Sequence, residues 1–328
     1  MNTRAPFMQR LAALTLLTTC LPLSSAYAHC IVGNRFFPAT LNIDDPCVAD
    51  ELSFPTISSF STGDQPAARQ LDISGEFSKR ITDDFGISVG STWSRISAPG
   101  APVAYGFQNL ETAFQYQVVK NAEHEFAMMA SLNIEWGGSG AQSVGADRFT
   151  TYAPTINFGK GFGDLPDSAG WLRAFAVTGS IGYAIPGSSS TTSVDPDSGD
   201  ITVTQNPRLL QWGGSLQYSM PYLKSAVIDL GLPDVVNKLI PIVEAQFVTP
   251  VSNTADSGTK TTGTINPGII YVGKTYQVGV EAIVPINRDS GGNVGVIGQL
   301  HLYLDDMFPN SIGRPIFATG MNTTRTSQ

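Results

Sequence analysis

The stretch Leu110-Glu-Thr-Ala-Phe-Gln-Tyr-Gln-Val118 decides the fold class. Leu110, Phe114, Tyr116 and Val118 fall on every second position, together with a threonine, and the residues between them are Glu, Ala and Gln. A period of two places alternate side chains on opposite faces of a β-strand. The stretch therefore predicts a strand with one apolar face and one small, polar face.

The same alternation recurs in runs of about 10 to 13 residues between residues 69 and 304. Strands of soluble sandwiches usually have ~5–6 residues, whereas strands of transmembrane barrels have ~9–11. The polar faces are rich in Gly, Ser, Thr, Asn and Gln and poor in Lys, unlike a solvated exterior, which usually carries more charge. We therefore favour a membrane barrel with its apolar face toward lipid over a soluble sandwich.

The links between the runs set the expected strand count. Short links near 82–84, 121–124 and 273–275 alternate with longer links rich in Gly, Ser, Thr, Asp and Asn. Bacterial barrels have an even number of strands, tight periplasmic turns and longer outer loops. Eleven runs are clear, so we expect one more strand in residues 50–60, made irregular by Pro55. The predicted fold is all-β, a single antiparallel transmembrane barrel of about 12 strands, with 10 or 14 as alternatives.

Composition supports lipid as the partner of the surface. Charged residues make up 14% of the 328 residues, against roughly 25% in an average soluble domain. The net charge of −8 argues against a nucleic-acid partner, because such binders carry basic patches.

The N-terminus predicts export. Arg4 and Arg10 precede an apolar run from Leu11 to Leu23, and Ala26-Tyr27-Ala28 is a small-x-small cleavage pattern. The competing interpretation, a lipoprotein anchor at Cys20, lacks a small residue before the cysteine. Residues 1–28 are thus expected to be a signal peptide, and the expected location is the outer membrane of a Gram-negative bacterium.

Cys30 and Cys47 are the two cysteines of the mature chain. An even pair in an oxidising compartment predicts a disulfide, and closing a loop of this length is worth ~3 kcal/mol in the chain-entropy model. The expected organisation is a signal peptide (1–28), an N-terminal disulfide segment with the first irregular strand (29–68), the barrel (69–304) and a periplasmic C-terminal tail (305–328).

No catalytic residue is predicted. The pattern Gly86-Ile-Ser88-Val-Gly90 lies inside an alternating run, whereas a G-x-S-x-G nucleophile requires a sharp strand-to-helix turn. Neither His124 nor His301 is clearly paired with a serine, so a barrel lipid hydrolase is the weakest alternative. His29 would be the first mature residue, able to chelate copper through its amine and imidazole, but the sequence shows no further ligand.

Acidic residues are the candidate lumen-lining groups. Five glutamates fall on polar strand faces: Glu76, Glu111, Glu135, Glu244 and Glu281. An aqueous lumen with these carboxylates would favour cations. The alternative is that they form hydrogen bonds across a packed, closed interior.

One further acidic group is a weak candidate for Ca²⁺. Asp195, Asp197 and Asp200 lie in the longest outer loop, where carboxylates on a glycine-containing turn suit this ion. Ordinary solvated loop acids are the alternative, and no other cofactor is expected.

Several segments resemble uncharacterised Gram-negative outer-membrane barrels similar to the family labelled "MetA-pathway of phenol degradation". They are Asn109-Leu110-Glu111, Gly159-Lys160-Gly161-Phe162-Gly163 and Tyr183-Ala184-Ile185-Pro186. The resemblance covers roughly residues 70–304 and implies a barrel that passes small, often apolar substrates, without assigning any functional residue. The expected function is thus a passive channel for small apolar or cationic molecules. The alternative is a non-transporting barrel that presents loops such as 186–206 to binding partners.

Overall fold

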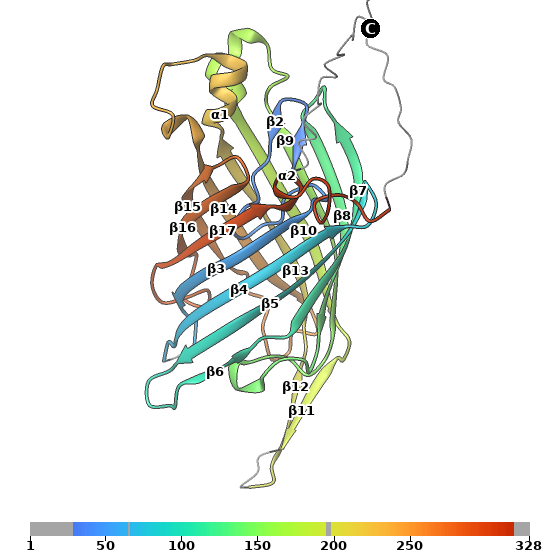
Figure 1. Cartoon of the computed structure of the whole chain (residues 1–328). Coiled ribbons are helices and arrows are strands. Elements are labelled where there is room, and N and C mark those ends of the chain that lie inside the picture. Colours follow the sequence, from blue (N-terminus) through green and yellow to red (C-terminus); the bar gives the residue numbers. More distant parts are fainter. Residues whose placement is uncertain (1–28, 65, 195–197, 318–328) are drawn as a thin grey trace, which may run out of the picture.

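The computed structural model describes residues 29–64, 66–194 and 198–317, and most of them form one antiparallel sheet that closes on itself (Figure 1). Each strand pairs with the next along the chain, and the first barrel strand pairs with the last. The wall contains twelve strands, which confirms the predicted fold class. They are β3 (Glu51–Ser61), β4 (Arg69–Arg80), β5 (Phe85–Ser97), β7 (Leu110–Asn121), β8 (Phe126–Trp136), β9 (Thr151–Gly161), β10 (Phe175–Pro186), β13 (Arg208–Tyr218), β14 (Leu239–Ser252), β15 (Thr262–Val272), β16 (Tyr276–Pro285) and β17 (Gly295–Tyr303).

Two local irregularities interrupt the wall. The short strand β6 (Ala104–Phe107) pairs with the last part of β5 and precedes β7, which pairs with the first part of β5. In β3 the register shifts between Ser53 and Thr56, around Pro55. The strand predicted before residue 69 is therefore present and irregular where the proline stands.

The apolar side chains of the wall face outward. Phe114, Leu132 and Leu216 are 41%, 38% and 48% exposed, whereas their polar strand neighbours Gln115 and Gln217 are buried. A soluble sandwich would bury the apolar set, so the exposures exclude that alternative and confirm the predicted direction of the alternation.

The two ends of the barrel differ. One end, here called the α1 end, carries the short links and the helical segments η2 (Asp167–Ala174), α1 (Met220–Tyr222), η3 (Leu223–Val227), η4 (Val236–Lys238) and α2 (Leu304–Met307). The other, the β11 end, carries η1 (Gln142–Val144) and the projecting hairpin of β11 (Ser190–Val194) and β12 (Ile201–Gln205) (Figure 1). Within the described ranges, no helix combines the length and apolar character needed to span a bilayer.

The N-terminal segment fills part of the barrel. Residues 29–50, here called the plug, comprise the short pair β1 (Ile31–Val32) and β2 (Arg35–Phe36) followed by a loop that lies against inward-facing wall positions. A Cβ atom at Gly159 of β9 would lie 2.7 Å from Pro46, and one at Gly279 of β16 would lie 2.5 Å from Leu41. Glycine at these wall positions leaves the space that the plug occupies.

The described part of the predicted C-terminal tail packs at the α1 end. After α2 the chain returns to the end of β4, where the Ile316 and Phe317 N–H groups donate to the carbonyls of Arg80 and Ile81 at 3.2 and 2.8 Å. The predicted signal peptide and residues 318–328 of the tail lie outside the described residues.

Candidate functional site in the barrel lumen

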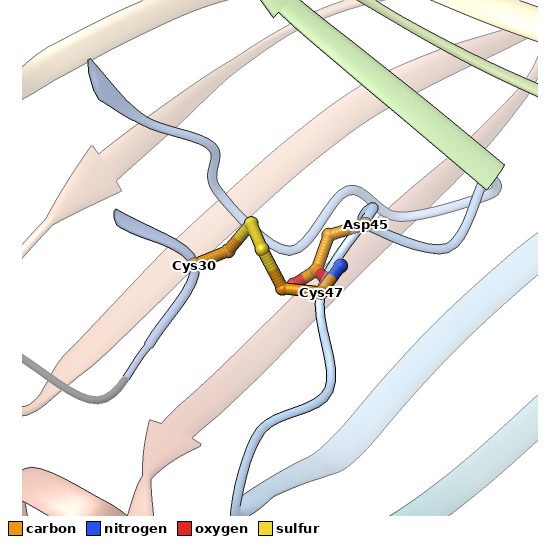
Figure 2. A group of neighbouring side chains, drawn as sticks. All are labelled: Cys30, Asp45 and Cys47. Atoms are coloured by element: carbon orange, nitrogen blue, oxygen red, sulfur yellow. A yellow bond between two sulfur atoms is a disulfide. The ribbon is translucent and has the colours of Figure 1, made fainter. Parts of the chain in front are cut away.

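The disulfide lies inside the lumen. Cys30 and Cys47 are joined, as predicted, with their Cα atoms 5.4 Å apart (Figure 2). Asp45 lies beside them, and its carboxylate accepts the Cys47 N–H at 2.9 Å. Because both sulfurs are bonded to each other, this group offers no thiolate to a metal, and its role is to close the loop of the plug.

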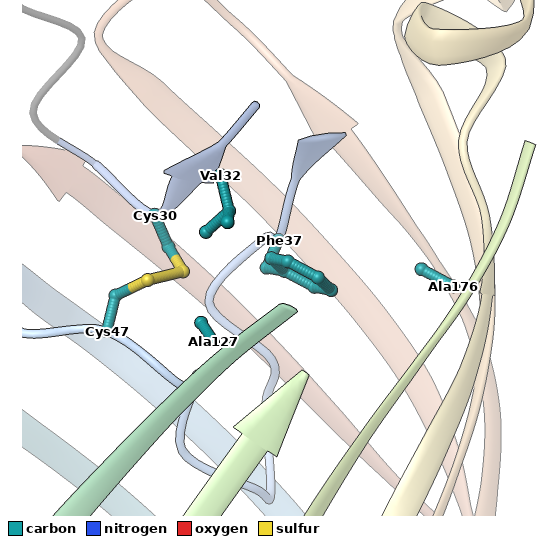
Figure 3. Close-up of a cluster of buried hydrophobic side chains, with 6 residues drawn as sticks. All are labelled: Cys30, Val32, Phe37, Cys47, Ala127 and Ala176. Carbon is teal, nitrogen blue, oxygen red and sulfur yellow. A yellow bond between two sulfur atoms is a disulfide. The ribbon is translucent and has the colours of Figure 1, made fainter. Parts of the chain in front are cut away.

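The disulfide belongs to a buried apolar cluster between the plug and the barrel wall. Val32 and Phe37 of the plug pack with the cystine against Ala127 of β8 and Ala176 of β10, all buried (Figure 3). Alanines on the inward face of the wall leave room for the Phe37 ring. This cluster seats the plug against one side of the barrel.

Leu41 and Asn42, here called the tip of the plug, bind two of the predicted lumen glutamates. One oxygen of Glu244 accepts hydrogen bonds from the Leu41 N–H at 3.1 Å, the Asn42 N–H at 3.1 Å and the Asn42 side-chain amide at 2.9 Å. The same amide also donates to Glu281 at 2.9 Å. Both glutamates are almost fully buried, so they hold the plug instead of lining an open path.

Leu41 packs on an apolar patch of the inner wall. The patch consists of four buried isoleucines, Ile240, Ile242, Ile270 and Ile297. These residues depart from the small, polar inner face that the alternation predicts. Large apolar residues on an inner strand face indicate that this part of the wall contacts protein and not water.

Arg35 anchors the plug at the α1 end. Its fully buried guanidinium pairs with Glu125 at 3.1 Å, donates to the carbonyls of Arg173 and Ala174, and stacks 3.7 Å from the ring centre of Tyr222. Burial lowers the pKa of Arg35, and the Glu125 carboxylate counters this effect. Burial likewise raises the pKa of Tyr222 to about 12.

Three polar cavities remain beside the plug. The first, of about 300 Å³, is lined by five acidic residues, Asp44, Asp45, Glu51, Glu76 and Glu111. A second, of about 240 Å³, shares three of these residues and adds Glu135, and a third of about 150 Å³ also reaches Asp44. None of the residues lining these three cavities is Lys or Arg. Three of the five predicted glutamates, Glu76, Glu111 and Glu135, thus line polar space. Glu111 of β7 and Glu135 of β8 lie opposite each other in the strand register.

A serine, a histidine and a glutamate meet in the first cavity. His301 of β17 is buried, its Nδ1 atom lies 2.8 Å from the Ser53 hydroxyl of β3, and its Nε2 atom lies 3.2 Å from the Glu51 carboxylate. This group was not predicted, because Ser53 and His301 are 248 residues apart in the sequence. The closure of the barrel brings the two strands together.

The candidate calcium residues are only partly described. Asp195 and Asp197 lie outside the described residues. Asp200 is exposed, and its carboxylate accepts a hydrogen bond from the Ser198 hydroxyl at 2.9 Å. The calcium site remains a prediction.

Comparisons with known proteins find barrels among the solved structures but do not assign the chain to a family. No protein-family model matches the chain, and no curated protein matches it. Among solved structures, the KdgM porin is 13% identical over 75% of this chain and 98% of its own, with a TM-score of 0.41. The NanC porin is 9% identical over 76% and 98%, with a TM-score of 0.43. The transport unit of the autotransporter AIDA-I from Escherichia coli is 12% identical over 83% and 94%, also with 0.43. Values this low assign no family, and the resemblance to the phenol-degradation family stays unconfirmed.

Proposed function

We propose that the chain is an outer-membrane channel of small conductance, selective for small cations, whose lumen is narrowed by its own N-terminal plug. Three features support the proposal: the outward apolar belt, the closed wall and the acidic cavities beside the plug. The α1 end, with its short links, would face the periplasm, and the β11 end would face outward, as in other bacterial barrels.

The outer surface supports a place in lipid. Large apolar side chains are exposed on eleven of the twelve wall strands, and Trp136 is the last residue of β8, at the β11 end. Trp171 lies at the α1 end, in η2. Tryptophans near both rims of an apolar band are typical of the aromatic girdles of membrane barrels.

The observation that carries the proposal is the set of acidic side chains that line the lumen cavities. Six acidic side chains and, among the described lining residues, no Lys or Arg line the two larger of these cavities, which share Asp44, Glu76 and Glu111. When ionised, these carboxylates concentrate cations and repel anions. A cavity of about 300 Å³ holds on the order of ten waters, so a channel that runs through it would pass ions and small solutes only.

Planar bilayers test this proposal. The purified protein is expected to give small, stable conductance steps and a reversal potential in a KCl gradient that indicates cation preference. If the protein is folded, as shown by heat-modifiable gel migration, and never conducts, the channel proposal is wrong. If it conducts but prefers anions, the acidic cavities do not determine its selectivity.

A second candidate function, ester hydrolysis, is favoured by one observation, the contact of Ser53 with His301 and of His301 with Glu51. In this order the three groups have the roles of nucleophile, base and orienting acid. A fluorophosphonate probe should label wild-type protein on Ser53 and fail to label Ser53→Ala or His301→Gln. Equal labelling of all three proteins, or no labelling of any, would discard the hydrolase.

A further inference from the structure

His29 and two consecutive aspartates meet at the α1 end, where the plug begins and α2 follows the last strand. The Nδ1 atom of His29 lies 2.9 Å from the carboxylate of Asp306. Ligand atoms of His29, Asp305 and Asp306 all lie within 4.8 Å of one another. An imidazole and two carboxylates thus converge on one point.

One of these carboxylates lacks a partner that its burial requires. Asp305 is 2% exposed, and its Oδ1 atom accepts the Asp306 N–H at 2.9 Å. Its Oδ2 atom is buried with no hydrogen-bond partner among the described residues. The Arg80 guanidinium is engaged elsewhere, with Asp50 and the Gly313 carbonyl. A buried carboxylate oxygen without a partner is costly, and a bound cation would remove that cost.

The imidazole is held in place before any ion arrives. His29 stacks on Tyr303 with ring centres 4.4 Å apart, and Phe36 meets it edge-on at 5.1 Å. The Tyr303 hydroxyl donates to Gln277 at 2.7 Å, which fixes the ring on which His29 rests. Such supporting contacts orient a metal-binding histidine.

We propose that His29, Asp305 and Asp306 bind a divalent metal ion of the class that includes Zn²⁺ and Cu²⁺. Imidazole nitrogen with carboxylate oxygen suits these ions, at bond lengths of about 2.0–2.2 Å. Two atoms bound to one ion lie at most about 4.4 Å apart, so side-chain movements of less than about 1 Å complete the geometry.

Export would add a fourth donor. Cleavage after Ala28, which the sequence predicts, converts the backbone nitrogen of His29 into a free amine on the same residue as the imidazole. Amine and Nδ1 then chelate one ion. The metal would tie the first mature residue, and with it the start of the plug, to the segment after β17.

Metal titration of the exported protein tests the site independently of transport. Protein purified in detergent and stripped with a chelator is titrated with Zn²⁺ by calorimetry. Wild type is expected to bind one ion at least 10-fold more tightly than Asp305→Asn/Asp306→Asn. The matched control Asp229→Asn/Asp234→Asn, which removes two exposed carboxylates at the same end, should bind like wild type. Equal affinity of wild type and Asp305→Asn/Asp306→Asn would overturn the proposal.

Copper spectroscopy keeps the proposal testable if the double variant does not fold. The electron paramagnetic resonance spectrum of Cu²⁺ bound to wild type should show nitrogen coupling that weakens in His29→Gln, while Asp306→Asn alone should lower the affinity. A spectrum that is the same in wild type and His29→Gln would reject His29 as a ligand. Refolded chain with a Met before His29 should bind more weakly than exported chain, and equal binding would remove the amine from the ligand set.

Discussion

The side-chain amide of Asn42 donates a 2.9 Å hydrogen bond to the carboxylate of Glu244, which lies 202 residues further along the chain. The same oxygen also accepts two backbone N–H groups of the plug. A glutamate in the middle of a barrel strand therefore specifies where the tip of the plug sits. Loosening this contact should change both stability and conductance.

Asn42→Leu removes the amide while keeping a side chain of similar size. Glu244 and Glu281 then lose a donor in a buried place, which costs about 1–3 kcal/mol. We expect urea unfolding in detergent at lower denaturant concentration and larger single-channel conductance. The control Asn34→Leu, at an exposed turn of the plug, should resemble wild type in both measurements. Unchanged conductance with a shifted unfolding midpoint would show that the tip does not restrict the path.

Arg35→Met breaks a buried ion pair and leaves Glu125 without its cation. Removing one partner of such a pair typically costs about 3–5 kcal/mol, because the other charge stays buried. Adding Glu125→Gln should recover part of the loss. Thermal unfolding of both variants measures the effect, and a single variant as stable as wild type would mean that Arg35 does not anchor the plug.

Asp44→Asn/Glu76→Gln/Glu111→Gln neutralises three carboxylates shared by the two larger cavities. Because a less negative lumen attracts cations less, the ratio of cation to anion permeability should fall at least about two-fold. Reversal potentials in a KCl gradient give this ratio. Glu123→Gln, at the α1 end and outside these cavities, is the control, and a ratio that does not move would locate selectivity elsewhere.

Leu132→Arg places a charge on the outward face of β8. If that face contacts acyl chains, folding into lipid vesicles should lose about 2–4 kcal/mol. Ala255→Arg, in an exposed link at the β11 end, should fold like wild type. Equal folding free energies for the two variants would argue that Leu132 does not meet lipid.

The wall of the barrel was predictable because its determinants are local. Alternation along a strand such as 110–118 fixes which face is apolar, and the parity of the links required the strand at 51–61. The Cys30–Cys47 disulfide followed from an even cysteine count in an exported chain.

The contents of the lumen were not predictable in the same way. Residues 37–50 have no periodicity, and their position depends on wall residues far away in sequence, such as Glu244. Alternation tells which face Glu281 occupies but not that Asn42 will meet it there. Ile240 and Ile242 interrupt the otherwise polar inner face, but the sequence alone does not show that Leu41 packs against them.

Single-channel conductance of wild type beside a chain lacking residues 30–47 tests the central claim most directly, with heat-modifiable gel migration confirming that both barrels are folded. A channel narrowed by its own plug predicts small, cation-preferring steps for wild type and several-fold larger steps for the shortened chain. Equal conductance of the two proteins, or silence of the shortened and folded barrel, would contradict it.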